Sequence, residues 1–107
     1  MNFTIIHRFW DNQIELSVIA KDNSVGCRID IYEDDPETAI ISGLYTDTAH
    51  RQKGLAKKLL YFCVNLLRDR GCTKIQLRSD EDNWVRQWYI REGFEIISSQ
   101  VWMEKQI

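Results

Sequence analysis

The turn Arg51-Gln52-Lys53-Gly54-Leu55-Ala56 has residue types and a spacing that could hold an anion such as a pyrophosphate. It follows a strand pattern and opens a helical one. The N-terminus of a helix presents unpaired backbone N–H groups and about half a positive charge. Gly54 would let a ligand approach the backbone closely, and Arg51 and Lys53 would add positive charge. The spacing is not that of a P-loop, and the alternative interpretation is a solvated basic turn at the start of a helix.

A second segment that could do chemistry is Asp82-Asn83-Trp84-Val85-Arg86-Gln87-Trp88-Tyr89-Ile90-Arg91-Glu92-Gly93-Phe94. A tyrosine phenol has an ordinary pKa of about 10, so Tyr89 would be protonated at neutral pH and able to donate a proton. The alternative is a packed core aromatic, because Trp84 and Trp88 are close in the sequence.

The hydrophobic pattern predicts the elements that position these segments. Alternating β-branched and aromatic residues predict a four-stranded antiparallel meander over residues 3–9, 14–20, 25–32 and 38–45. Leucines at spacings of three and four predict a helix from Gly54 to Arg70, ended by Gly71. The remaining pattern predicts a strand, a second helix and two closing strands, over residues 73–78, from Ser79 or Asp80 to about Arg91, 94–97 and 100–104.

These elements predict an α+β fold, an α/β sandwich with a largely antiparallel mixed sheet and two main helices. The strand–helix–strand unit around Gly54 should form a right-handed crossover between parallel strands. We expect a single domain over residues 1–107, because 107 residues suffice for one small domain and not for two.

Composition limits the classes of partner. The net charge of −2 gives no support to general nucleic-acid binding, whereas the local cluster of Arg51, Lys53, Lys57 and Lys58 suits a small anionic ligand. The three cysteines lack CxxC spacing, so we expect no metal site and a reducing compartment. The sequence shows no long apolar run, and we expect a cytoplasmic protein without a membrane segment.

The two segments together resemble the motifs of the GNAT superfamily of acetyl-CoA-dependent N-acetyltransferases. Residues 51–56 resemble its [QR]xxGx[GA] turn, and Tyr89 to Phe94 resembles its YxxxGF tyrosine-helix motif. Residues 101–105 are similar to the last strand of the family, so the resemblance extends over residues 14–107. It implies the GNAT acyl-CoA N-acyltransferase fold, with acetyl-CoA as the acetyl donor.

The resemblance also implies roles for individual residues. The amides of the turn would cradle the pyrophosphate of coenzyme A, the end of the fourth strand would pair with the pantetheine arm, and Asn83 would lie near the cofactor. The implied cofactor residues are Leu44, Tyr45, Thr46, Arg51, Gln52, Lys53, Gly54, Leu55, Ala56 and Asn83. Tyr89 would lie beside the sulfur and protonate the leaving thiolate. Asp47 is the first choice for a general base, followed by Glu33 and Glu37; an ordinary surface carboxylate is the alternative for each.

The sequence departs from the family pattern between its first two strands. Most members have one or two helices there, whereas about four residues, too few for a helix, separate the predicted strands. The acceptor site would then be open to a bulky amine, be walled by the second subunit of a homodimer, or be absent. The leading hypothesis is transfer of acetyl from acetyl-CoA to a primary amine of a small molecule or protein. The alternatives are a non-catalytic acyl-CoA-binding module and a protein-interaction domain that binds no nucleotide.

Overall fold

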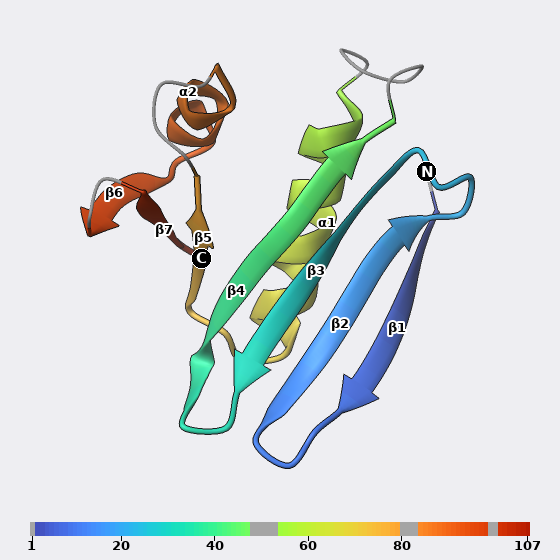
Figure 1. Cartoon of the computed structure of the whole chain (residues 1–107), viewed down its shortest axis with the longest axis vertical. Coiled ribbons are helices and arrows are strands. Elements are labelled where there is room, and N and C mark those ends of the chain that lie inside the picture. The colour runs from blue at the N-terminus through green and yellow to red at the C-terminus, as the bar shows by residue number, and fades with distance from the viewer. Residues whose placement is uncertain (1, 48–53, 80–83, 99–100) are drawn as a thin grey trace.

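The computed structural model describes residues 2–47, 54–79, 84–98 and 101–107. Its elements follow the predicted order: β1 (Phe3–Phe9), β2 (Gln13–Ala20), β3 (Val25–Tyr32), β4 (Asp35–Thr46), α1 (Leu55–Asp69), β5 (Lys74–Arg78), α2 (Trp84–Arg91), β6 (Glu95–Ser98) and β7 (Trp102–Gln106) (Figure 1). The α+β fold is therefore confirmed. The main difference in bounds is that β4 begins at Asp35 rather than Thr38, in a stretch that precedes its pairing with β5.

The strands form a 7-stranded mixed sheet in the order β1-β2-β3-β4-β5-β7-β6. Strands β1 to β4 are an antiparallel meander, as predicted. The predicted parallel pair is β4 and β5, which α1 connects. Only residues 10–12 separate β1 from β2, so the helices usual in the family at this point are missing.

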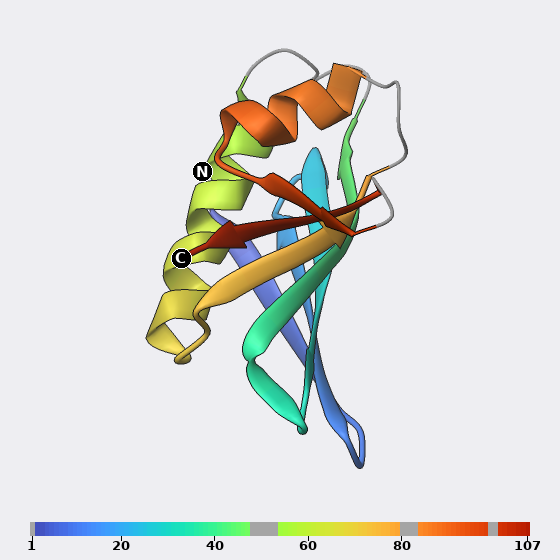
Figure 2. The same cartoon turned by 90° about the vertical axis from the view of Figure 1, so that its left-hand side faces the viewer.

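Both helices pack on one face of the sheet. Alternate residues of the strands, among them Leu16, Ile29 and Ile41, form one core with the apolar side of α1. Tyr89 of α2 and Phe94, which follows it, belong to the same core. Figure 2 shows the end of α2 close to the start of α1, where Lys57 Nζ lies 3.8 Å from Glu92 Oε1. In the described part of the chain no helix is long and apolar enough to cross a membrane.

The other face of the sheet is polar and stabilised by cross-strand ion pairs. Glu15 and Asp30 lie opposite each other on β2 and β3, a pairing of like charges that is unfavourable by itself. Arg28 resolves it, because its guanidinium lies 3.2 Å from a carboxylate oxygen of each. Arg8 of β1 also contacts Glu15, at 3.4 Å, and Gln13 donates a hydrogen bond to Asp30 at 2.9 Å. This face therefore needs no covering helix.

A cysteine pair links the sheet to α1. Cys27 of β3 and Cys63 of α1 are buried and their Sγ atoms are 3.7 Å apart, as a thiol–thiol contact. The hydrogen bond with Cys27, together with burial, raises the pKa of the Cys63 thiol. Burial also raises the pKa of the Cys72 thiol.

We predict that the free energy of unfolding falls as pH rises above about 8.5, the ordinary pKa of a cysteine in the unfolded chain. Because their folded-state pKa is raised, Cys63 and Cys72 keep their protons in the folded protein while the unfolded chain loses them. The expected slope is up to about 1.4 kcal/mol per pH unit for each cysteine. Urea unfolding at intervals from pH 7 to 9.5, below the ordinary range of tyrosine, measures it.

Cys63→Ala is the control variant, because it removes one of the two thiols. Its unfolding free energy should fall less steeply than that of the wild type over the same pH range. Parallel slopes for the two proteins would show that Cys63 does not contribute to the pH dependence.

Candidate functional site

The candidate site lies where β4 and β5 diverge. The two strands pair only from Thr38–Lys74 to Ile41–Leu77, after which β4 continues to Thr46 and β5 ends at Arg78. Between them is a cavity of about 220 Å³, lined by Ile41, Ser42, Gly43, Leu44, Leu77, Arg78, Ser79, Val85 and Tyr89. Three elements thus meet at the cavity: β4, the end of β5 and α2.

A β-bulge in β4 causes this divergence. The pairing with β3 passes from Arg28–Ser42 directly to Gly26–Tyr45, so Gly43 and its neighbour on β4 together oppose a single residue of β3. Gly43 has a φ of 61°, which glycine adopts without steric cost. The bulge bends β4, and in the described residues its pairing with β5 ends at Ile41, just before Ser42. A strand that extends beyond its neighbour can pair with an extended ligand.

Tyr89 forms the helix side of the cavity and is held there by its own segment. Gly93, with a φ of 96°, ends α2 and turns the chain back. Phe94 N then donates a 3.0 Å hydrogen bond to Tyr89 O, and the two rings pack edge to face with centroids 5.5 Å apart. The centroid of the Trp88 ring also lies 5.2 Å from that of Tyr89. The packing of this segment therefore explains the spacing between Tyr89, Gly93 and Phe94, which is also the spacing of the YxxxGF motif.

The environment of Tyr89 suits a proton donor. Its side chain belongs to the core, with 7% of the residue exposed, yet it lines the cavity. Burial raises the pKa of the Tyr89 phenol, and Cys27 adds to the effect. The phenol is therefore neutral at physiological pH and carries a proton that it can donate.

The described start of α1 contains three residues of the predicted anion site, Gly54, Leu55 and Ala56. Gly54 is the N-cap, with φ 72° and no side-chain capping bond, and the first turn contains no acidic residue. In the part of the chain that the structure describes, no side chain of the cap residue or of the first turn thus neutralises the amides that begin α1, and such amides attract anions. A Cβ atom added to Gly54 would meet nothing within 4 Å, so the space beside this residue is open. Leu55 is buried in the core and Ala56 follows it; Arg51, Gln52 and Lys53 lie outside the described residues.

The other predicted cofactor residues are distributed around the bulge. Leu44 lines the cavity. Tyr45 pairs with Gly26 and its ring lies over that residue on the polar face, where a Cβ on Gly26 would be 2.9 Å from the ring. Thr46 pairs with Val25 at the end of β4. Asn83 lies outside the described residues.

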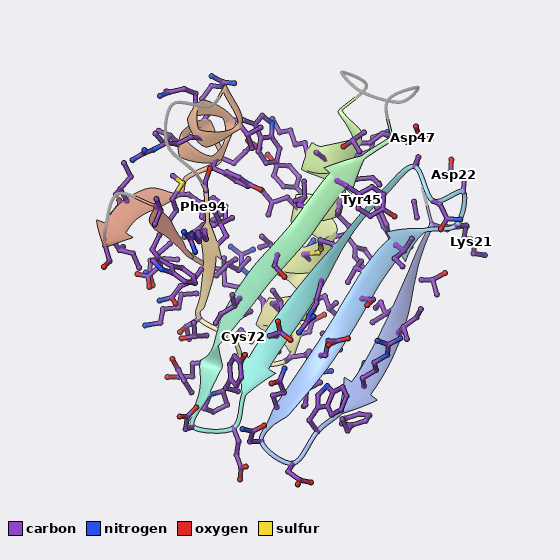
Figure 3. The ribbon with its side chains drawn as sticks, viewed as in Figure 1. Lys21, Asp22, Tyr45, Asp47, Cys72 and Phe94 are labelled. Carbon is purple, nitrogen blue, oxygen red and sulfur yellow. The ribbon has the colours of Figure 1, made fainter. Side chains whose placement is uncertain are left out.

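The structure does not bring the predicted general bases to the cavity. Asp47 follows β4 on the side of the turn that carries Lys21 and Asp22, where its backbone N donates to Ser24 O at 2.7 Å, whereas Phe94 lies across β4 (Figure 3). Asp47 does not line the cavity. Glu33 and Glu37 flank the start of β4, and Glu37 is five residues before Ser42, about 16 Å at the rise of a strand.

Sequence reasoning missed Ser42, Gly43, Arg78 and Ser79, all of which line the cavity. A signal was present for Gly43, because an isolated glycine inside a strand pattern often marks a bulge. Nothing comparable marks Arg78, whose place depends on how far β5 pairs with β4.

Most of the chain matches a known protein family. Residues 4–94 match the profile of the Acetyltransferase (GNAT) family. No sequence match to a curated protein was found.

Solved structures share the fold. The PaiA N-acetyltransferase from Thermoplasma acidophilum, in complex with coenzyme A, has a TM-score of 0.72 at 21% identity, over 90% of this chain and 62% of that one. The ribosomal-protein-S18-alanine N-acetyltransferase from Escherichia coli has a TM-score of 0.71 at 14% identity, over 92% and 72%. The YhbS N-acetyltransferase from Escherichia coli, in complex with CoA, has a TM-score of 0.66 at 16% identity, over 87% and 58%. This chain therefore spans less than two thirds of two of these proteins.

Proposed function

The chain belongs to the Acetyltransferase (GNAT) family, and from this we propose that it transfers the acetyl group of acetyl-CoA to a primary amine, by direct attack in a ternary complex. The observation that carries the proposal is that Tyr89, a buried neutral phenol, lines the cavity where β4 leaves β5. The family-specific tyrosine and the stretch of β4 beyond its pairing with β5 thus face the same space in the described structure.

We propose that acetyl-CoA binds along β4 and at the start of α1. The β4 backbone at Ser42, Leu44 and Thr46, which lies beyond the last residue that pairs with β5, would run alongside the pantetheine arm and pair with its amide groups. The pyrophosphate would bind the first amides of α1 beside Gly54, with Arg51, Gln52 and Lys53 around it and Asn83 near the cofactor. Because β4 leads directly into α1, both ends of this path lie at the same end of the sheet.

In the proposed reaction, the amine nitrogen attacks the thioester carbonyl and forms a tetrahedral intermediate. A backbone amide of this stretch of β4 would stabilise the oxyanion. The C–S bond then breaks, coenzyme A leaves as a thiolate, and Tyr89 donates its proton to the sulfur. The nitrogen, which became positively charged on attack, loses its proton to give the neutral amide, and the phenolate recovers a proton from solvent.

Among the described residues that line the cavity, no side chain is a base that could accept the proton of the attacking amine. No carboxylate or imidazole is among the described residues that line it. We therefore propose that water carries this proton to the polar face of the sheet, and that Asp47 could act as a base only through water. The same observation favours the second candidate function, a module that binds acyl-CoA without turnover. Release of free thiol from acetyl-CoA in the presence of an amine distinguishes the two.

We predict that Gly54→Ala weakens acetyl-CoA binding, because the new Cβ would enter the open space at the start of α1. Gly71→Ala is the matched control: Gly71, at the other end of α1, also has a positive φ and nothing within 4 Å of an added Cβ. Each substitution should cost about 1–2 kcal/mol of stability through backbone strain. Only Gly54→Ala should lose the stabilisation that acetyl-CoA gives to the folded protein.

The measurement is thermal unfolding with and without acetyl-CoA, with ATP as the phosphate-bearing control. Ligand at a hundred times its Kd stabilises by about 2.7 kcal/mol, and each kcal/mol raises Tm by about 4–8 °C in a domain of this size. If Gly54→Ala and Gly71→Ala gave equal shifts with acetyl-CoA, the assignment of the pyrophosphate site to Gly54 would be wrong.

We predict that Tyr89→Phe lowers kcat by roughly a hundredfold or more, the usual contribution of a general acid, with little change in acetyl-CoA affinity. The ring contacts with Trp88 and Phe94 remain, so the fold should be preserved. Because burial raises the pKa of Tyr89, the wild type should stay active up to pH 10 and lose activity above it, as the phenol ionises. The variant should lack this alkaline limb.

Tyr32→Phe serves as its control, since it removes the same atom from an exposed tyrosine at the far end of the sheet. Initial rates of thiol release over pH 7–11 compare the three proteins. Wild-type turnover and an unchanged alkaline limb in Tyr89→Phe would exclude Tyr89 as the acid.

A further inference from the structure

One positively charged side chain, that of Arg78, lines the cavity between β4 and β5. Of the residues that line it, only Arg78 and Tyr89 are ionisable, and the Tyr89 phenol is neutral at physiological pH. The guanidinium of Arg78 is therefore the one formal charge among the described residues of the cavity. A primary amine is itself a cation at neutral pH, so this charge repels an acceptor that carries nothing but amines.

Arg78 is available to a ligand. It is the last residue of β5 and is exposed. It pairs across the sheet with Trp102 of β7, an uncharged residue. In the described ranges Arg78 forms no ion pair; Asp80, Glu81 and Asp82, which follow in the sequence, lie outside those ranges.

Three carboxylates of the same sheet face, those of Glu15, Asp30 and Glu104, already have partners, and no ion pair of the described residues joins Arg78 to Glu95, which lies opposite Glu104 on β6. Glu104 of β7 accepts hydrogen bonds from Gln76 and Gln106, each at 2.9 Å, and lies 3.9 Å from Lys74 Nζ. Glu15 and Asp30 are engaged by the arginines of the cross-strand ion pairs. Arg78 thus faces this surface without a carboxylate of its own in the described structure.

The geometry also gives Arg78 a place on the path of the acceptor. Alternation along β5 puts Leu77 on the helix side, where it is buried, and Arg78 on the polar face. Val85 and Tyr89 of α2 close the cavity on the helix side. No helix of the described ranges covers the polar face, so an acceptor that came from this face would pass Arg78 and the exposed Ser42.

We propose that Arg78, assisted by the Ser42 hydroxyl, binds a carboxylate of the acceptor, so that the substrate class is amines that carry a free carboxylate, such as amino acids. This inference rests on the proposed function. A guanidinium binds a carboxylate through two parallel hydrogen bonds, which fixes the orientation of the bound molecule as well as its position. The negative charge also offsets the repulsion between the amine and Arg78.

The test compares amino acids with their carboxamides, which keep the amine and the side chain but lack the negative charge. Thiol release from acetyl-CoA gives kcat/KM for each pair, with spermidine as a purely cationic amine. We expect at least a tenfold preference for the free acid. Arg78→Gln should abolish this preference without a change in the KM for acetyl-CoA. Arg78→Lys, which keeps the charge but not the paired donors, should restore part of it.

Arg70→Gln is the charge-matched control, because Arg70 is exposed beyond the far end of α1. It should keep the wild-type preference. A second readout is binding alone: thermal unfolding of the protein saturated with coenzyme A, with and without each member of a pair. Free acids should raise Tm in the wild type and in Arg70→Gln, and not in Arg78→Gln.

The outcomes separate this inference from the proposed function. Equal or faster acetylation of carboxamides or spermidine would support the acetyltransferase and overturn the carboxylate site. A decrease in the kcat/KM of Arg78→Gln that is equal for acids and carboxamides, or a raised KM for acetyl-CoA, would also overturn the carboxylate site. Either result would indicate that Arg78 binds the cofactor. Binding of free acids that depends on Arg78, without turnover of any amine, would support the carboxylate site and contradict the enzyme. Neither binding nor turnover would contradict both.

Discussion

The site depends on one constraint, the extra residue that β4 carries opposite β3. Strands β4 and β5 are parallel neighbours in the middle of the sheet, where each backbone group normally has a partner. The bulge at Gly43 ends that pairing early and opens a cavity in an otherwise continuous sheet. A residue with a Cβ would resist the φ of 61° found there. The functional space is thus created by a backbone irregularity and only then lined by side chains.

A second constraint follows from the missing helices between β1 and β2. A sheet with one uncovered face must make that face compatible with water, and this chain does so with charge. Arg28 lies between two carboxylates that would otherwise repel each other, and Arg8 extends the network to the edge strand. The result is a polar surface that leads to the cavity from the side opposite the helices. The ion pairs that stabilise this face thus also leave the surface beside the cavity polar.

The two helices are joined where the cofactor would bind. Lys57, in the first turn of α1, contacts Glu92 just after α2, and Lys105 of β7 donates a 2.7 Å hydrogen bond to the Glu92 carbonyl. The Glu92 side chain is only 8% exposed, whereas that of Lys57 is 53% exposed, so the pair is shielded from solvent on the Glu92 side only. The contact brings the start of α1 next to the segment that follows Tyr89. The proposed anion-binding and proton-donating ends of the site therefore lie close together.

The sequence by itself determined the order and type of the elements and the family. Hydrophobic periodicity can be read from neighbouring residues alone. Gly71 and Gly93 mark the helix ends for a similar local reason, because the residue after a helix often has a positive φ, which glycine adopts readily. The YxxxGF spacing likewise identifies the Tyr89 segment from the sequence alone. Only the tertiary structure decided that Arg78 joins Tyr89 at the cavity and that Asp47 does not. Those facts depend on where β4 stops pairing with β5, and strand register is set by contacts between residues far apart in the sequence.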